Sequence, residues 1–186
     1  SPDTPGRVSA YERLAYLTSK KVLLRIAPVA TGKTSPTKPA EALDVKDMVG
    51  KNNIYWLEDK NEKLWKEQCL KTYFYDPAAN TWKDLNLPLN PPYRNCKYGL
   101  TYDEKNDVAI LVGGQISWNG PSCNDIWIFD VKKTEWKKME PQYMPSEKEK
   151  LILGESLMAD YDSRHEVVVL RSNTGFWAYR YKKVKN

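Results

Sequence analysis

Short apolar runs separated by polar turns follow one another along most of this chain. The clearest series lies between residues 99 and 139, where an apolar run at 108–112 ends in a glycine pair and an aromatic run at 125–130 follows after a loop. Runs this short, bounded by turn residues, are typical of β-strands joined by hairpins. Four strands are predicted in this segment, at residues 100–103, 108–112, 125–130 and 135–139.

The same pattern occurs on both sides of that segment, which indicates an internal repeat. Upstream, the four corresponding strands are predicted at residues 14–17, 22–26, 72–76 and 81–85. Downstream, three of them are predicted at residues 161–162, 167–170 and 176–179. Asp76 precedes Trp82 by the same six positions that separate Asp130 from Trp136. Aspartates end four of these strands, and we expect their carboxylates to bond the N–H groups of the turns that follow.

The repeated residues resemble the kelch-repeat β-propeller family, in particular the blades of the galactose oxidase type. The positions that carry the pattern are Gly113, Gly114, Phe129 and Trp136 in the middle segment, Tyr75 and Trp82 in the first, and Tyr179 in the third. The resemblance implies four-stranded antiparallel blades around an axis, with the first strand innermost. It predicts an all-β chain, a propeller segment of about three four-stranded blades in a single unit, residues 1–186.

The repeat also sets the expected blade boundaries. Blade one is expected at residues 7–26 and 69–85, an insertion in it at 27–68, blade two at 94–139, and blade three at 151–186. Only the middle segment has the glycine pair; Arg25-Ile26-Ala27 and Arg171-Ser172 stand there in the others. Within the insertion, a short helix is predicted at 39–49 and a hairpin at 53–65.

Blade three lacks the tryptophan of a fourth strand, because seven positions after Tyr179 stands Asn186. Its fourth strand is therefore either poorly formed, supplied by residues 1–8, or supplied by a partner chain. Three blades also do not close a ring, since propellers have at least about four. The apolar flanks of the first and third blades would then face water. We expect either that the chain is a portion of a larger propeller or complex, completed by another protein chain, or that a second copy of it completes a six-bladed ring.

Catalytic chemistry is not expected from these residues. His165 is the only histidine, which excludes Ser/His/Asp and multi-histidine metal sites within the chain. The copper site of the galactose oxidase type needs two histidines and is missing. Gly32-Lys33-Thr34 lacks the first glycine of a phosphate-binding loop. We predict no enzyme activity, no cofactor and no metal. A Cys96–Cys123 disulfide and unpaired thiols both remain open.

Composition and charge narrow the class of partner. The net charge of +5 comes from lysines interspersed with acidic residues, so a nucleic-acid surface is not expected. The longest apolar runs, such as 167–170, are far too short to span a membrane. The trimmed-looking start at Ser1 and the resemblance favour an extracytoplasmic location, secreted or periplasmic, although the compartment stays open.

The expected function is that of a non-catalytic protein–protein interaction module, a scaffold or accessory subunit of a larger assembly. Its contact face would combine the insertion with the loops between strands, because loops on a rigid scaffold commonly bind partners. The predicted partner-binding residues are Tyr55, Trp56, Tyr93, Arg94, Trp118 and Asn119. The alternative is a secreted carbohydrate-binding propeller module, in which Trp118, Tyr93 and Tyr55 would stack on a glycan.

Overall fold

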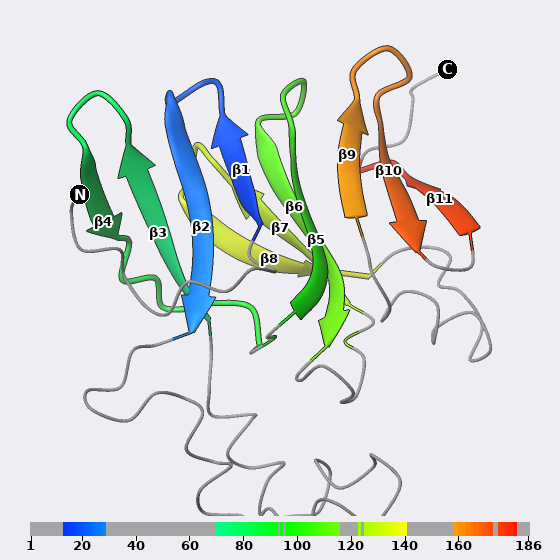
Figure 1. Ribbon diagram of the computed structural model, residues 1–186, viewed down its shortest axis with the longest axis horizontal. Helices are drawn as coiled ribbons and strands as arrows, with labels where there is room; N and C mark the ends of the chain where they lie inside the picture. Colours follow the sequence, from blue (N-terminus) through cyan, green and yellow to red (C-terminus); the bar gives the residue numbers. More distant parts are fainter. Residues whose placement is uncertain are drawn as a thin grey trace, which may run out of the picture.

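A computed structural model describes residues 13–28, 70–92, 94, 96–115, 123, 125–140, 158–172 and 175–181. All regular elements in these residues are β-strands, which confirms the all-β prediction for this part of the chain. The strands form three separate antiparallel sheets, two of four strands and one of three (Figure 1). The strands are short and end at turn residues, and the middle strands of the second sheet are buried on both faces. This is the pattern of a sheet packed between two neighbours.

The first two sheets have four strands each, in chain order. The first contains β1 (Leu14–Leu17), β2 (Val22–Pro28), β3 (Leu70–Asp76) and β4 (Thr81–Asp84). The second contains β5 (Cys96–Asp103), β6 (Val108–Gln115), β7 (Ile126–Asp130) and β8 (Glu135–Met139). Each sheet is therefore a meander in which every strand pairs with the next.

The third sheet contains β9 (Met158–Asp162), β10 (Val167–Ser172) and β11 (Gly175–Tyr179). Among the described residues it has no fourth strand, and the candidate residues 1–8 lie outside them. The boundary predicted for the insertion was wrong by two residues, because Ala27 and Pro28 continue β2 and pair with Lys71 and Leu70. The helix and the hairpin predicted inside the insertion lie outside the described residues.

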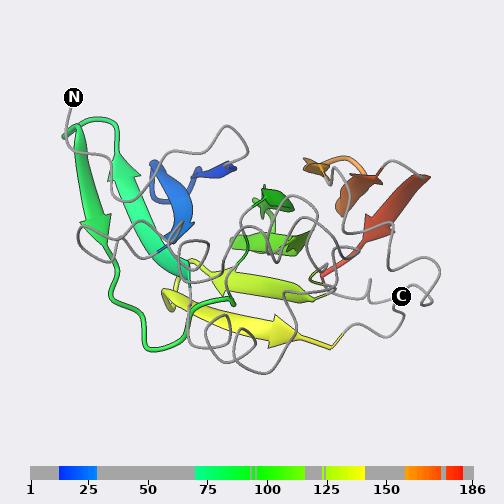
Figure 2. The ribbon, with the colours of Figure 1, turned by 60° about the horizontal axis from the view of Figure 1, so that its bottom comes forward.

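The three sheets stand side by side with their first strands together. β1 contacts β5, and β5 contacts β9. Figure 2 shows the sheets spreading like a fan from these inner strands, with β4, β8 and β11 at the outer ends. The first strand of each sheet is thus the innermost one, as expected from the repeat.

Strand register proves that the three segments repeat the same structure. Tyr75, Phe129 and Tyr179 pair with Leu23, Ala109 and Val168, respectively. Each of these partners is the second residue of its strand, and each strand follows a four-residue turn. The three aromatic residues therefore occupy one position of the repeat, and any residue can be assigned its counterpart in the other sheets.

The turns repeat as closely as the strands. The last residue of each four-residue turn has a positive φ: Lys21 57°, Asn80 51°, Asp107 56°, Thr134 58° and Glu166 57°. This left-handed residue closes a hairpin built around a type I turn. The predicted capping role of the aspartates is confirmed: carboxylate oxygens of Asp76, Asp103, Asp130 and Asp162 accept hydrogen bonds from turn N–H groups at 2.9–3.1 Å.

Two apolar cores join the sheets. The core between the first and second sheets includes Leu24, Leu111, Phe129 and Trp136. The core between the second and third includes Ile110, Val112, Ile128 and Leu170. β6 is buried at every position, because the second sheet is covered on both faces. Burial of this kind contributes roughly 1.5–3 kcal/mol for each large side chain and is the main force that holds the sheets together.

Candidate functional site

Most of the predicted partner-binding residues lie outside the described part of the chain. Tyr55, Trp56, Tyr93, Trp118 and Asn119 belong to this group. Their placement on a common contact face therefore stays a prediction.

Arg94 is the one predicted contact residue that the structure describes, and the exposed position expected for it is wrong. Its side chain is buried. The guanidinium donates to the carbonyl oxygen of Gly113 at 2.7 Å and to the carboxylate of Asp125 at 3.3 Å, and it forms an ion pair with that carboxylate at 3.2 Å. The indole N–H of Trp127 donates to the same carboxylate at 2.7 Å. Arg94 thus connects the chain before β5 to the end of β6 and to the residue before β7. Asp125 supplies the charged partner that a buried guanidinium requires.

The residues assigned to the repeat do occupy structural positions. Tyr75 pairs with Trp82 across β3 and β4, with ring centroids 4.9 Å apart. Phe129 and Trp136 form the equivalent pair, 5.2 Å apart. Gly113 and Gly114 have φ values of 59° and 112°, a left-handed backbone that glycine adopts without a steric penalty. At this end of β6 the N–H of Gly113 donates to the carbonyl oxygen of Asp125 at 3.0 Å, just before β7.

A hollow of about 390 Å³ runs along the inner strands. Its walls are the same three positions of each inner strand, which are residues 14–16, 100–102 and 159–161, together with Glu104 and Ser163. Tyr16, Tyr102 and Tyr161 are equivalent residues of the three sheets, each two positions before its turn. The carboxylates of Glu104 and Asp160 and the side chains of Tyr16 and Tyr102 give the hollow a polar lining, whereas the hydroxyl oxygen of Tyr161 is buried. Such a lining suits a ligand with many hydroxyl groups.

Local contacts shift the pKa values of two groups beside this hollow. Burial is the main reason that the pKa of Tyr161 rises to about 12, and the neighbouring Asp103 carboxylate raises it further. Burial alone would raise the pKa of Asp107, but hydrogen bonds from Ser19 and Tyr102 outweigh it, so this pKa lies below its usual value. Tyr161 is therefore a neutral phenol and Asp107 a carboxylate at neutral pH.

The third sheet presents one face that no described element covers. This open face consists of Met158, Asp160, Val167, Val169, Arg171, Phe176 and Ala178, which point away from the second sheet by strand alternation. Phe176 is 74% exposed and Met158 is 55% exposed. The Arg171 guanidinium stands 6.0 Å from the centre of the Phe176 ring.

The equivalent positions of the second sheet are part of a core. Val169 corresponds to Ile110 and Phe176 to Ile126, and both isoleucines are buried under the third sheet. The same repeat position is thus covered by a following sheet in one case and open in the other. An open face of this kind is the strongest sign of an interaction surface in the described residues.

The opposite end of the stack is different. The corresponding outward face of the first sheet carries Tyr73, Tyr75 and Trp82, and the Arg25 guanidinium lies 5.4 Å from the Trp82 ring centre. Arg25 and Tyr73 are buried, whereas Leu14 and Tyr16 of the inner strand are about half exposed. This end is therefore only partly open.

The described residues offer neither a cluster of metal ligands nor a membrane-spanning helix. They contain no group of three or more histidine, cysteine, aspartate or glutamate side chains placed to hold a metal ion. They also contain no helix that has the length and apolarity needed to cross a membrane.

Comparison with known proteins identifies the fold but no family. No family model matches the sequence, and no curated protein matches it either. Among solved structures, the chain is similar to the one titled "Structure of YjhT", a kelch-like β-propeller protein, with a TM-score of 0.50 and 12% sequence identity. The match covers 91% of this chain and 44% of YjhT, so the chain spans less than half the length of that protein. The three antiparallel sheets are accordingly those of a partial β-propeller-like fold.

Proposed function

We propose that this chain is a non-catalytic protein–protein interaction module built from three kelch-type propeller blades. It acts as a scaffold or accessory subunit, and its end blade binds another protein of a larger assembly. The observation that supports this proposal is the open face of the third sheet. Its apolar residues stand at repeat positions that are buried core in the second sheet, and Phe176 is 74% exposed.

Physical cost is the reason to expect a partner there. Leaving a large side chain such as Phe176 in water forgoes roughly 1.5–3 kcal/mol that burial would provide. Exposed apolar patches on a sheet also promote unwanted association. A partner that covers this face would remove both penalties, as the third sheet does for Ile110 and Ile126 of the second.

The test compares two substitutions that each place a charge on an exposed apolar residue. Phe176→Asp alters the open face, whereas Leu89→Asp alters an equally apolar, half-exposed residue after β4 and serves as the control. Full-length protein is purified from its native source, and the mass of the complex is measured by light scattering. Wild type and Leu89→Asp should be found in an assembly, and Phe176→Asp should be released from it. Equal masses for all three would refute the proposal.

A second function, carbohydrate binding, is favoured by the hollow along the inner strands. Three equivalent tyrosines and two carboxylates line about 390 Å³, a volume in the range of small-molecule sites. A glycan array with wild type and with Tyr16→Ala tests this alternative. Binding that Tyr16→Ala weakens would support it, and an array without binding would count against it.

A further inference from the structure

The indole N–H of Trp177 is buried, yet it finds no hydrogen-bond acceptor among the described residues. Trp177 lies in β11 and packs against the core between the second and third sheets. Buried polar groups of folded proteins almost always have a partner, and each exception calls for an explanation. A free donor beside an apolar core indicates a place where an acceptor can bind.

The second sheet shows what kind of acceptor this donor takes. Trp127 is the counterpart of Trp177, because each stands two positions before the aromatic residue of the repeat. The Trp127 N–H donates to the carboxylate of Asp125 at 2.7 Å. Asp125 stands two positions before Trp127, and Gly175 occupies that place in the third sheet. The third sheet therefore keeps the donor of this pair but carries no side chain to accept from it.

The first sheet also has a charged side chain at this repeat position. Lys71 is the counterpart of Asp125 and Gly175, since it stands two positions before Tyr73. Its ammonium forms an ion pair with the Asp84 carboxylate at 2.7 Å. In two sheets the position thus holds a charged group with a partner of opposite charge, and in the third it holds a glycine.

The space over that glycine is open. A Cβ atom added at Gly175 would have no heavy atom within 4 Å apart from those of its own chain neighbours. Gly175 and Trp177 lie two positions apart in one strand, so they face the same side of the sheet. The open space is therefore on the side of the indole, where the Asp125 side chain lies in the second sheet. A group of a ligand can enter it.

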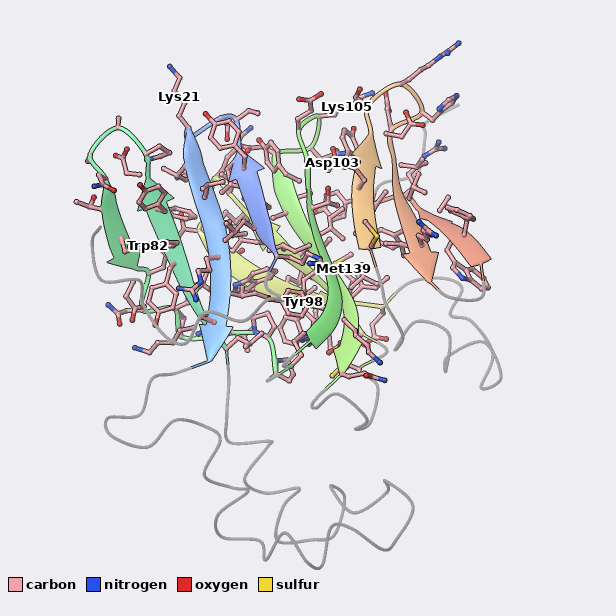
Figure 3. All side chains as sticks on the ribbon, viewed as in Figure 1. Lys21, Trp82, Tyr98, Asp103, Lys105 and Met139 are labelled. Atoms are coloured by element: carbon pink, nitrogen blue, oxygen red, sulfur yellow. The ribbon has the colours of Figure 1, made fainter. Side chains whose placement is uncertain are left out.

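A carboxylate at this place needs a cation nearby. In the second sheet, the buried Arg94 guanidinium supplies it, 3.2 Å from Asp125. Beside the third sheet, Met139 of β8 packs against the same core as Trp177, and Figure 3 labels it there. Lys137 stands two positions earlier and thus faces the same side of β8. It is exposed and has no ion-pair partner among the described residues.

We infer that the space beside Trp177 and over Gly175 is a binding site for the carboxylate of a ligand. The Trp177 N–H donates to one carboxylate oxygen, as Trp127 donates to Asp125, and the Lys137 ammonium balances the charge. The site goes beyond the proposed function. It lies between two described sheets, so it exists whichever element covers the open face.

Acetate is the probe, and the indole N–H signals of isotopically labelled protein report its binding by NMR. The Trp177 signal is assigned by its loss in Trp177→Phe. Sodium acetate should shift this signal saturably, whereas sodium chloride of the same ionic strength should not. The Trp127 signal should stay in place, because its N–H already has an acceptor. An unmoved Trp177 signal, or equal shifts at Trp177 and Trp127, would overturn the inference.

A second titration distinguishes the two sources of a carboxylate. It uses a capped peptide in which an aspartate side chain is the only carboxylate. Tighter binding of the peptide than of acetate would support the site and indicate a protein ligand. Tighter binding of acetate would support the site and indicate a free carboxylic acid. Shifts of the Trp177 signal by neither probe would refute it.

Substitution of Gly175 tests the open space. Gly175→Asp would give the third sheet the carboxylate that Asp125 gives the second. It should move the Trp177 signal without acetate and abolish the response to acetate, whereas Gly175→Ala should keep that response. If Gly175→Asp still responds to acetate as wild type does, the space does not adjoin the indole and the inference fails.

A matched pair of lysine variants tests the cation. Lys137→Gln should weaken acetate binding roughly two- to fivefold, because an exposed ion pair contributes little. Lys138→Gln makes the same change on the other side of β8 and should leave the affinity unchanged. Equal affinities for these two variants would overturn the part assigned to Lys137.

Discussion

Gly99 allows a prediction about how closely the inner strands approach. This glycine lies in β5, on the side that faces β9, and it pairs with Val112. A Cβ atom added there would stand 2.6 Å from the Cβ of Ala159 and 3.4 Å from its backbone nitrogen. Carbon atoms in contact are ordinarily about 3.5–4.0 Å apart. A methyl group at this position would therefore push the second and third sheets apart by about 1 Å.

The magnitude follows from two opposing terms. Overpacking a well-packed site costs about 1–3 kcal/mol, and here the obstacle is a Cβ that cannot rotate away. Replacing glycine by alanine also lowers the entropy of the unfolded chain, which stabilises the fold by about 0.4–1 kcal/mol. Gly99→Ala should therefore destabilise the protein by about 1–2 kcal/mol. Gly175→Ala is the matched control, because nothing lies within 4 Å of its added Cβ, and only the favourable term applies.

Urea unfolding followed by tryptophan fluorescence measures the difference. The two variants should differ by about 2 kcal/mol, which is roughly 1 M in the midpoint of the transition. The double variant Gly99→Ala/Ala159→Gly should recover most of the loss, since it removes the obstructing methyl group. Equal midpoints for Gly99→Ala and Gly175→Ala would refute the close approach of β5 and β9.

Three more predictions follow from the contacts between and within sheets. The pKa of Tyr161 is about 12 in the folded protein against an ordinary 10, so the unfolded chain loses this proton at a lower pH than the folded one. The free energy of unfolding should therefore fall between about pH 10 and about pH 12. Urea titrations over this range should find a smaller fall in Tyr161→Phe than in wild type. Trp136→Phe leaves a cavity in the core and removes the buried N–H that donates to the Thr72 hydroxyl at 2.8 Å. It should cost about 2–3 kcal/mol by urea unfolding, and about 1 kcal/mol less in a Thr72→Val background, where the hydrogen bond is already absent. Arg94→Met leaves the Asp125 carboxylate without its ion pair and should lower the free energy of unfolding by about 3 kcal/mol. The double variant Arg94→Met/Asp125→Asn should be closer to wild type in urea unfolding. Equal losses of stability for Arg94→Met and the double variant would contradict this account.

Side-chain contacts between the turns that join the first two strands of each sheet also connect neighbouring sheets. Apolar cores are not directional, so they hold neighbouring sheets together without specifying which sheet comes next. The Ser19–Asp107 and Lys105–Glu166 contacts are directional and differ between the two junctions. They contribute little stability because they are exposed.

The sequence by itself determined the strands, the turns and their threefold repeat. These features depend on local chemistry: strand alternation, aspartates that accept turn N–H groups, and aromatic residues at a constant spacing. Tyr75, Phe129 and Tyr179 accordingly occupy one register position, as their spacing predicted. That Asn186 stands where the repeat would place the outermost tryptophan of the third segment is likewise a matter of counting, and residues 182–186 lie outside the described part of the chain.

The tertiary structure alone decided what each side chain meets. Arg94 was expected on a contact face, yet it is buried because Gly113 and Asp125, 19 and 31 positions away, bind its guanidinium. In the sequence, Ser19 and Lys105 look like ordinary solvent-exposed turn residues. The packing of the sheets places them beside the carboxylates of Asp107 and Glu166, respectively. Such contacts depend on the distance between sheets, and local pattern contains no information about that distance. The open face of the third sheet is likewise defined by the neighbour that covers its counterpart in the second.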